Sequence, residues 1–346
     1  MASSMVAPRA FHFIEVDEAR GILKKTSQNR DELLREIDYY RSLPKELQYL
    51  FPRIIDASIE SEFPSVEIEY YGYPTLHSFF MSDDPNIFGD AIDSHNFDED
   101  IFNAGDENLI TAERENVYAG WKKIFERMKT AVDDMKKFPP DSNDSECKNA
   151  VREMYVEKVY RRFDRIRYDS NLPAPIKDRI AEIISKLPNL VDDLLLENAG
   201  ECFHVIHGDM CLPNVMSECE FNFVRMIDPR GEFGTFKIHG DGRYDLAKLM
   251  HSIEGGYDFI IEDRFEVSSE EDQIDLKFDP AFENKTDTCV KIFSEVFNLD
   301  SNQMRQLRLI ESTLFLSMIP LHNDAPRRQL AMAARGMDLF ERVERS

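Results

Sequence analysis

Three oxygen-bearing side chains in the second half of the chain occur at spacings that suit phosphoryl transfer. The tripeptide His207-Gly208-Asp209 ends one apolar run, Asn214 follows Asp209 by five positions, and Asp228 ends a second apolar run fourteen positions later. Transfer of a phosphoryl group from ATP requires one carboxylate to orient and deprotonate an acceptor hydroxyl. It also requires hard oxygen ligands for Mg²⁺. A loop with an Asp and an Asn, facing an Asp at the tip of the adjoining hairpin, supplies both.

The spacing of Asp209 and Asn214 equals that of the protein-kinase catalytic loop, with Gly208 in place of its Arg. Together with Ile227-Asp228 and the later segment from Gly240 to Ala247, this series resembles the aminoglycoside phosphotransferase and choline kinase superfamily. That superfamily is the small-molecule branch of the protein-kinase-like fold. The resemblance implies a two-lobed α+β protein with a small β-rich N-lobe and a large, mainly helical C-lobe.

The resemblance also implies roles for individual residues. Asp209 would be the catalytic base, Asn214 and Asp228 the magnesium ligands, and Asp245 would brace the catalytic loop from the next helix. We expect His207 to hold the same loop by hydrogen bonding. The sequence after Asp228 is Pro-Arg-Gly where protein kinases have Phe-Gly, so an activation-loop switch is not expected.

The small lobe should supply a lysine for the nucleotide phosphates and a helical glutamate to hold it. Lys24 ends a short predicted strand, and Glu36 lies on the helix that follows. Lys25 is an alternative, because neighbouring strand residues point to opposite faces and the sequence does not choose the face. Glu32 is a weaker alternative to Glu36.

A glycine-rich phosphate loop is missing, since no GxGxxG occurs and Gly21 is the one glycine in the first 71 residues. We therefore expect a truncated N-lobe, or one completed by a strand from a partner. The segment containing Tyr70 and Tyr71 lies where the resemblance places the hinge between the lobes. There, backbone groups would bind the adenine.

The pattern of apolar residues supports this organisation. Residues 1–75 read as the N-lobe, with four short strands and one helix. Residues 76–346 read as the C-lobe, with an acidic insertion at about 83–107 and mainly helices beyond it. The predicted helices are Ala112–Phe138, Ala150–Tyr168, Pro175–Asn198, Tyr244–Glu254, Thr286–Phe297, Ser301–Met318 and Arg327–Glu344.

Composition excludes several partners. The chain has 346 residues, with 42 Lys and Arg against 66 Asp and Glu, for a net charge of −24. Such a chain repels nucleic acids and anionic membranes. Its five cysteines form no CxxC pair, which favours a reducing cytoplasm. The acidic insertion is either a solvated loop or a segment that attracts a cationic ligand, and the sequence does not determine the oligomeric state.

The sequence thus predicts a phosphotransferase, dependent on ATP and Mg²⁺, that acts on a hydroxyl of a small metabolite such as a sugar, amino sugar or amino alcohol. Two alternatives remain open at this point. One is a non-catalytic kinase-like protein that binds a nucleotide or a partner. The other is a kinase-like enzyme that modifies a protein acceptor by phosphorylation or nucleotidyl transfer.

Overall fold

The computed structural model describes residues 12–82, 84, 87–88 and 106–345, and these form two compact units. Unit 1 comprises residues 1–135, 212–231 and 291–298, and unit 2 comprises residues 136–211, 232–290 and 299–346. The predicted mixture of a small strand-rich N-terminal part and a larger helical part is confirmed. The predicted lobe boundary between residues 75 and 76 stays a prediction. The predicted acidic insertion lies almost entirely outside the described residues.

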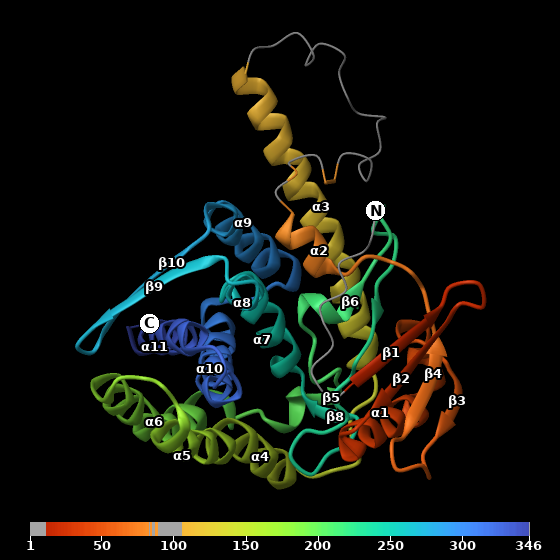
Figure 1. Ribbon diagram of the computed structural model, residues 1–346, viewed down its shortest axis with the longest axis horizontal. Coiled ribbons are helices and arrows are strands. Elements are labelled where there is room, and N and C mark those ends of the chain that lie inside the picture. Colours follow the sequence, from red (N-terminus) through yellow and green to blue (C-terminus); the bar gives the residue numbers. More distant parts are fainter. Residues whose placement is uncertain (1–11, 83, 85–86, 89–105, 346) are drawn as a thin grey trace. The chain divides into compact units, whose positions relative to one another are not determined.

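Unit 1 contains a four-stranded antiparallel sheet in the order β1-β2-β4-β3, visible at the right of Figure 1. Strand β2 is therefore central, with β1 on one side and β4 on the other. Because strands alternate their side chains between the two faces, β2 presents successive residues to different environments. The strands are β1 (His12–Asp17), β2 (Ile22–Ser27), β3 (Ile54–Ser58) and β4 (Ser65–Glu69).

Helix α1 (Arg30–Ser42) packs against one face of this sheet. The side chain of Asn29 caps its first turn by accepting a hydrogen bond from the backbone N–H of Glu32. Leu33 and Ile37, one turn apart, bury themselves on the sheet. Their partners are Val66, Ile68, Leu23, Ile54, Ala57 and Ile59. This packing decides which face of β2 meets α1.

The rest of unit 1 is built from helices and a short hairpin. A cluster of aromatic rings, including Trp121, Phe125 and Phe221, joins helix α3 to its neighbours. The hairpin follows a short 3₁₀ turn and carries two of the predicted site residues near its ends. The elements are η1 (Lys45–Leu50), α2 (Leu76–Met81), α3 (Asp106–Met135), η6 (Leu212–Asn214), β6 (Val215–Met216) and β7 (Arg225–Met226).

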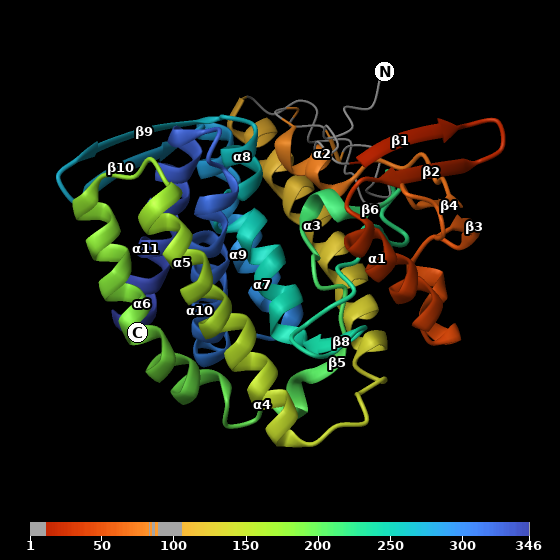
Figure 2. The same ribbon diagram turned by 60° about the horizontal axis from the view of Figure 1, so that its bottom comes forward.

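Unit 2 is mainly helical. Helix α10 packs against both α7 and α11, and the three helices are labelled in Figure 2. A π-helical turn, η4 (Glu153–Glu157), joins α4 to α5. The elements are α4 (Asp144–Arg152), α5 (Lys158–Asp169), α6 (Ala174–Leu195), η5 (Gly200–Cys202), β5 (Phe203–Val205), β8 (His239–Asp241), α7 (Gly242–Ile253), α8 (Tyr257–Ile261), β9 (Phe265–Glu270), β10 (Gln273–Phe278), α9 (Pro280–Phe297), α10 (Ser301–Met318), η7 (Ile319–Leu321) and α11 (Pro326–Arg345). The last turns of α9 belong to unit 1.

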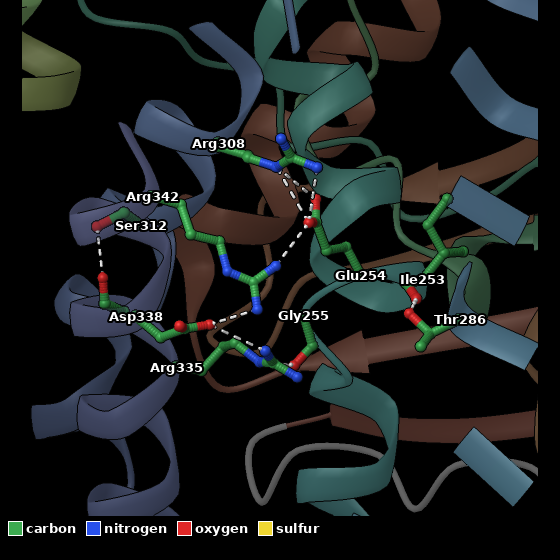
Figure 3. Close-up of polar contacts among 10 residues, drawn as sticks. Ile253, Glu254, Gly255, Thr286, Arg308, Ser312, Arg335, Asp338 and Arg342 are labelled. Atoms are coloured by element: carbon green, nitrogen blue, oxygen red, sulfur yellow. Dashed lines mark hydrogen bonds and ion pairs between the residues drawn. The ribbon is translucent and has the colours of Figure 1, made fainter. Parts of the chain in front are cut away.

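A buried charge cluster lies where α7 meets α10 and α11. The carboxylate of Glu254, just after α7, accepts hydrogen bonds from Arg308 and Arg342 (Figure 3). Glu311 is also fully buried, and its two carboxylate oxygens have no hydrogen-bond partner among the described residues. Burial and the charge of Glu254 raise the pKa of Glu311 well above its usual range, because both disfavour the ionised carboxylate.

The structure differs from the predicted elements in several places, and two of these differences have a local cause. The helix predicted to begin at Ala150 begins at Asp144 as α4, because Asn143 and Glu146 form a capping box in which each side chain satisfies the other's backbone N–H group. The hairpin β9–β10 was not predicted, although Phe265, Val267, Leu276 and Phe278 follow a two-residue period. Among the described residues, no helix is both long and apolar enough to cross a membrane.

Candidate active site

A buried lysine on β2 contacts two carboxylates from different parts of unit 1. Nζ of Lys25 lies 2.7 Å from Oε2 of Glu36 on α1 and 2.8 Å from Oδ1 of Asp228. Lys25 and Glu36 are buried, whereas the side chain of Asp228 is 51% exposed. Burial lowers the pKa of Lys25, but the charges of Glu36 and Asp228 outweigh it and leave this pKa raised. The lysine therefore stays charged.

Glu36 is held in the interior of unit 1 by more than its lysine. The hydroxyl of Tyr40, one helical turn further along α1, donates to Oε1 of Glu36 at 3.4 Å. Burial raises the pKa of Glu36, and the charge of Lys25 opposes this shift. Burial, with the charges of Glu36 and Asp228, also raises the pKa of Tyr40. The pair of Lys25 and Glu36 is thus fixed by the packing of α1.

The predicted lysine, Lys24, lies on the other face of β2. In the sheet register it stands opposite Glu15 of β1 and Glu67 of β4, so it has acidic neighbours on both sides. The structure thus brings Lys25, and not Lys24, to Glu36 and Asp228. Glu32, the weaker alternative to Glu36, lies in the exposed first turn of α1 and accepts a hydrogen bond from Asn29.

The two predicted magnesium ligands lie at corresponding ends of one hairpin. Val215 pairs with Met226, and the N–H of Ile227 donates to the carbonyl oxygen of Asn214 at 3.0 Å. Asn214 and Asp228 therefore flank a single pair of strands. Their amide and carboxylate oxygens fit the preference of Mg²⁺, which takes one or two carboxylates and keeps waters or phosphate oxygens as its other ligands.

The donor set is small. In the described part of the chain, no three His, Cys, Asp or Glu side chains are grouped so as to hold a metal ion. A site built from Asn214 and Asp228 would therefore depend on the phosphates of a nucleotide to complete the coordination. A dedicated, all-protein metal cage does not fit these residues.

The backbone around Asp228 is unusual. Asp228 has φ of 56°, in the left-handed region that Asp tolerates better than most residues. Gly231 follows with φ of 69°, and a Cβ atom there would lie 2.6 Å from the carbonyl oxygen of Arg35 on α1. The segment after Asp228 can pass this close to α1 because residue 231 has no side chain.

The predicted catalytic loop in unit 2 is held by Asp245 on α7. Its carboxylate accepts the backbone N–H of His207 at 2.7 Å and that of Gly208 at 2.8 Å. Nδ1 of the buried His207 accepts the N–H of Asp209 at 3.1 Å. Burial raises the pKa of Asp245 to about 7, against the effect of these two backbone hydrogen bonds. Both residues thus lie where a bracing role requires them.

Lys248 was not predicted as a site residue, and it contacts the predicted base. Its Nζ lies 2.7 Å from Oδ1 of Asp209. Lys248 is 8% exposed. Burial lowers its pKa, but the charge of Asp209 outweighs burial and leaves the pKa raised. A signal was present in the sequence: Lys248 follows Asp245 by three positions, which places both on one side of a helix.

The two hinge tyrosines are held by local contacts. The N–H of Tyr70 donates to the carbonyl oxygen of Gly21 at 2.8 Å. The hydroxyl of Tyr71 lies 3.2 Å from the carbonyl oxygen of Phe51 and 3.0 Å from Oε2 of Glu69. Burial, assisted by Glu69, raises the pKa of Tyr71 to about 12. The binding of adenine by this segment stays a prediction.

The candidate residues divide between the two units. Lys25, Glu36, Asn214 and Asp228 belong to unit 1, whereas Asp209 and the residues that hold its loop belong to unit 2. Asp209 and Asn214 are nevertheless separated by only four residues of chain.

No family model matches the sequence, and no curated protein matches it either. Solved structures do match over nearly the whole chain. A thermostable mutant of the aminoglycoside phosphotransferase APH(4)-Ia is 12% identical, with 96% of this chain and 90% of that chain covered and a TM-score of 0.52. A glucosamine kinase is 10% identical, with 99% of this chain and 84% of that chain covered and a TM-score of 0.52.

These similarities establish the fold. The chain shares the fold of these two proteins, and the protein-kinase-like fold predicted from the sequence is thereby confirmed. At identities this low the similarity shows the fold alone, because one fold can carry many different activities.

Proposed function

We propose that this protein is a phosphotransferase, dependent on ATP and Mg²⁺, that phosphorylates a hydroxyl group of a small metabolite. The observation that carries the proposal is the contact of Lys25 with both Glu36 and Asp228. The same combination of strand lysine, helical glutamate and metal-binding aspartate is required in kinases for phosphoryl transfer. In this assignment Lys25 takes the role predicted for Lys24.

The ion pairs of Lys25 prepare it to bind phosphate. Its ammonium is buried and charged, and Glu36 holds it from the side of α1. Asn214 and Asp228 would hold magnesium on the phosphates, where the bound ion neutralises negative charge. Tyr70 and Tyr71 would contribute backbone groups to the adenine.

The reaction needs one proton transfer. Asp209 accepts the proton of the acceptor hydroxyl as the hydroxyl oxygen bonds to the γ-phosphorus, and the bond from that phosphorus to the bridging oxygen of ADP breaks. Asp245 and His207 hold the loop, so that the Asp209 carboxylate is in place before the acceptor binds.

The acceptor class follows from the fold and from charge. The two similar structures are an aminoglycoside phosphotransferase and a glucosamine kinase. A sugar, amino sugar or amino alcohol is therefore the class to test first. A net charge of −24 favours the approach of a cationic or neutral acceptor over an anionic one.

The test is ATP consumption with Mg²⁺ over a panel of sugars, amino sugars and amino alcohols. We expect turnover with at least one of them and a loss of about 10²- to 10⁴-fold in Asp209→Asn. Asp178→Asn, at an exposed position of α6, is the matched control. Melting temperatures would establish that both variants fold.

Other outcomes identify the alternatives. Equal ATP consumption by the wild type and Asp209→Asn would contradict the assignment of the base. No rise in melting temperature with Mg-ATP would favour a protein that binds a partner without catalysis, because a ligand of the native state stabilises it by mass action. Mass spectrometry of a protein acceptor would distinguish added phosphate from added AMP.

A further inference from the structure

Lys248 places a buried positive charge directly on the predicted base. Its Nζ is 2.7 Å from Oδ1 of Asp209, and its side chain is 11% exposed against 30% for that of Asp209. Removing an ammonium group from water costs free energy unless an anionic partner compensates for the lost hydration. Lys248 points its charge at a single carboxylate oxygen, and that oxygen belongs to the residue proposed to take the acceptor's proton.

The loop does not depend on Lys248 for its position. Asp245 binds the N–H groups of His207 and Gly208, and His207 binds the N–H of Asp209. These contacts hold the backbone of the loop, whereas the ion pair of Lys248 is made with the side chain of Asp209. If Lys248 only supported the fold, there would be no reason for it to contact the proposed base, because other residues hold the backbone of the loop.

Other titratable groups lie around the pair of Lys248 and Asp209, and none of those described next supplies a second positive charge. Asp245 interacts electrostatically with both Asp209 and Lys248, and Tyr244 and Cys211 interact with Lys248. His251, one turn further along α7, is fully buried, and burial together with Lys248 lowers its pKa well below the usual range. His251 is therefore neutral, and Lys248 is the cation that faces Asp209 among these groups.

We propose that Lys248 is a positioning residue that fixes the rotamer of the Asp209 carboxylate and keeps it ionised. This inference rests on the proposed role of Asp209 as base. A hydroxyl bound to Asp209 would lie within about 8 Å of the ammonium, given ordinary hydrogen-bond lengths. As the proton moves to Asp209, the ion pair loses its negative partner.

The pH dependence of the reaction distinguishes this role from a structural one. A cation within hydrogen-bond distance lowers the pKa of a carboxyl group by about one unit or more. Removing Lys248 should therefore raise the pKa of Asp209, and the acid limb of kcat/KM should move to higher pH by about one unit. A lysine that only supported folding would change the melting temperature but leave this limb unmoved.

The experiment compares Lys248→Met, Lys248→Arg and the exposed control Lys277→Met. We expect Lys248→Met to lower kcat about tenfold or more with little change in KM for ATP. Lys248→Arg should recover part of kcat, because it keeps the charge. Lys277→Met should match the wild type. Titration of the Asp209 carboxyl by carbon NMR provides a readout that does not require turnover.

The outcomes separate this inference from the proposed function. If Asp209→Asn abolishes turnover but Lys248→Met retains the wild-type kcat and acid limb, the role of Lys248 is refuted and the proposed function stands. If no variant affects ATP consumption, the proposed function fails. In that case the NMR titration still tests the effect of Lys248 on Asp209. If the pKa of Asp209 is the same in Lys248→Met as in the wild type, Lys248 does not keep this carboxylate ionised.

Discussion

Nζ of Lys25 lies 2.8 Å from Oδ1 of Asp228, although 203 positions separate the two residues in the chain. Glu36 shares the same ammonium group at 2.7 Å. A single lysine thus connects the central strand of the sheet, helix α1 and the end of a hairpin within unit 1. Burying these charged groups costs desolvation free energy. We interpret the arrangement as one that holds the lysine ready to bind a further anionic group.

Substituting the two neighbouring lysines tests which one binds phosphate. Lys25→Met should weaken Mg-ATP binding about tenfold or more, because it removes a charge-assisted contact. Lys24→Met, on the opposite face of β2 beside Glu15 and Glu67, should leave this affinity unchanged. Isothermal titration of each variant with Mg-ATP measures the effect. The reverse result would restore Lys24 as the phosphate ligand.

The substitution Gly231→Ala tests how closely the segment after Asp228 approaches α1. Gly231→Ala adds a Cβ atom 2.6 Å from the carbonyl oxygen of Arg35 and strains a residue with φ of 69°. We expect a loss of about 1–3 kcal/mol in the free energy of unfolding. Gly21→Ala is the matched control, since φ is 64° there and the nearest atom lies 3.8 Å away. Equal losses in urea denaturation would mean that the clash costs nothing.

Asp245→Asn tests how the catalytic loop is held. The two N–H groups of His207 and Gly208 bind different oxygens of the Asp245 carboxylate, and an amide would present an NH₂ donor in place of one of these oxygens. We expect faster amide exchange at these two positions and a fall in kcat of about tenfold, with Mg-ATP affinity preserved. Hydrogen exchange of the peptide around residues 203–211 provides the measurement. Unchanged exchange would show that Asp245 does not hold the loop.

Glu311 tests the buried charge cluster of unit 2 drawn in part in Figure 3. Its folded-state pKa is raised above the ordinary value of 4.5 by burial and by Glu254, against the charges of Arg335, Arg308 and Arg342. A raised carboxyl pKa contributes stability that is complete below pH 4.5 and is lost as the pH rises through the folded-state pKa. The loss can reach about 1.4 kcal/mol per pH unit.

Glu311→Gln removes this titration. The stability of the variant relative to the wild type should therefore increase as the pH rises from about 4.5, the ordinary pKa of a glutamate side chain. Thermal unfolding between pH 4 and 8 measures the trend, and Glu266→Gln at an exposed position of β9 serves as the control. Parallel pH curves for Glu311→Gln and the wild type would mean that Glu311 does not titrate as the structure requires.

Much of the candidate site could be predicted because its parts are local in the chain. Asp209 and Asn214 are close in the chain, and the hairpin from Val215 to Met226 brings Asn214 to the level of Asp228. Asp245 lies in the first turn of α7, within the segment from Gly240 to Ala247 that itself resembles the aminoglycoside phosphotransferase and choline kinase superfamily. Spacing alone carries such information, since turns and hairpins bring residues together without help from the rest of the molecule.

The tertiary structure decided the residues whose partners are distant. Strand alternation puts Lys24 and Lys25 on opposite faces, and only the packing of α1 on the sheet determines which face meets Glu36. The contact of Lys248 with Asp209 likewise depends on how α7 packs against the loop. The sequence by itself determined the order of the chemical groups along the chain. Long-range packing determined which lysines contact the carboxylates of the candidate site.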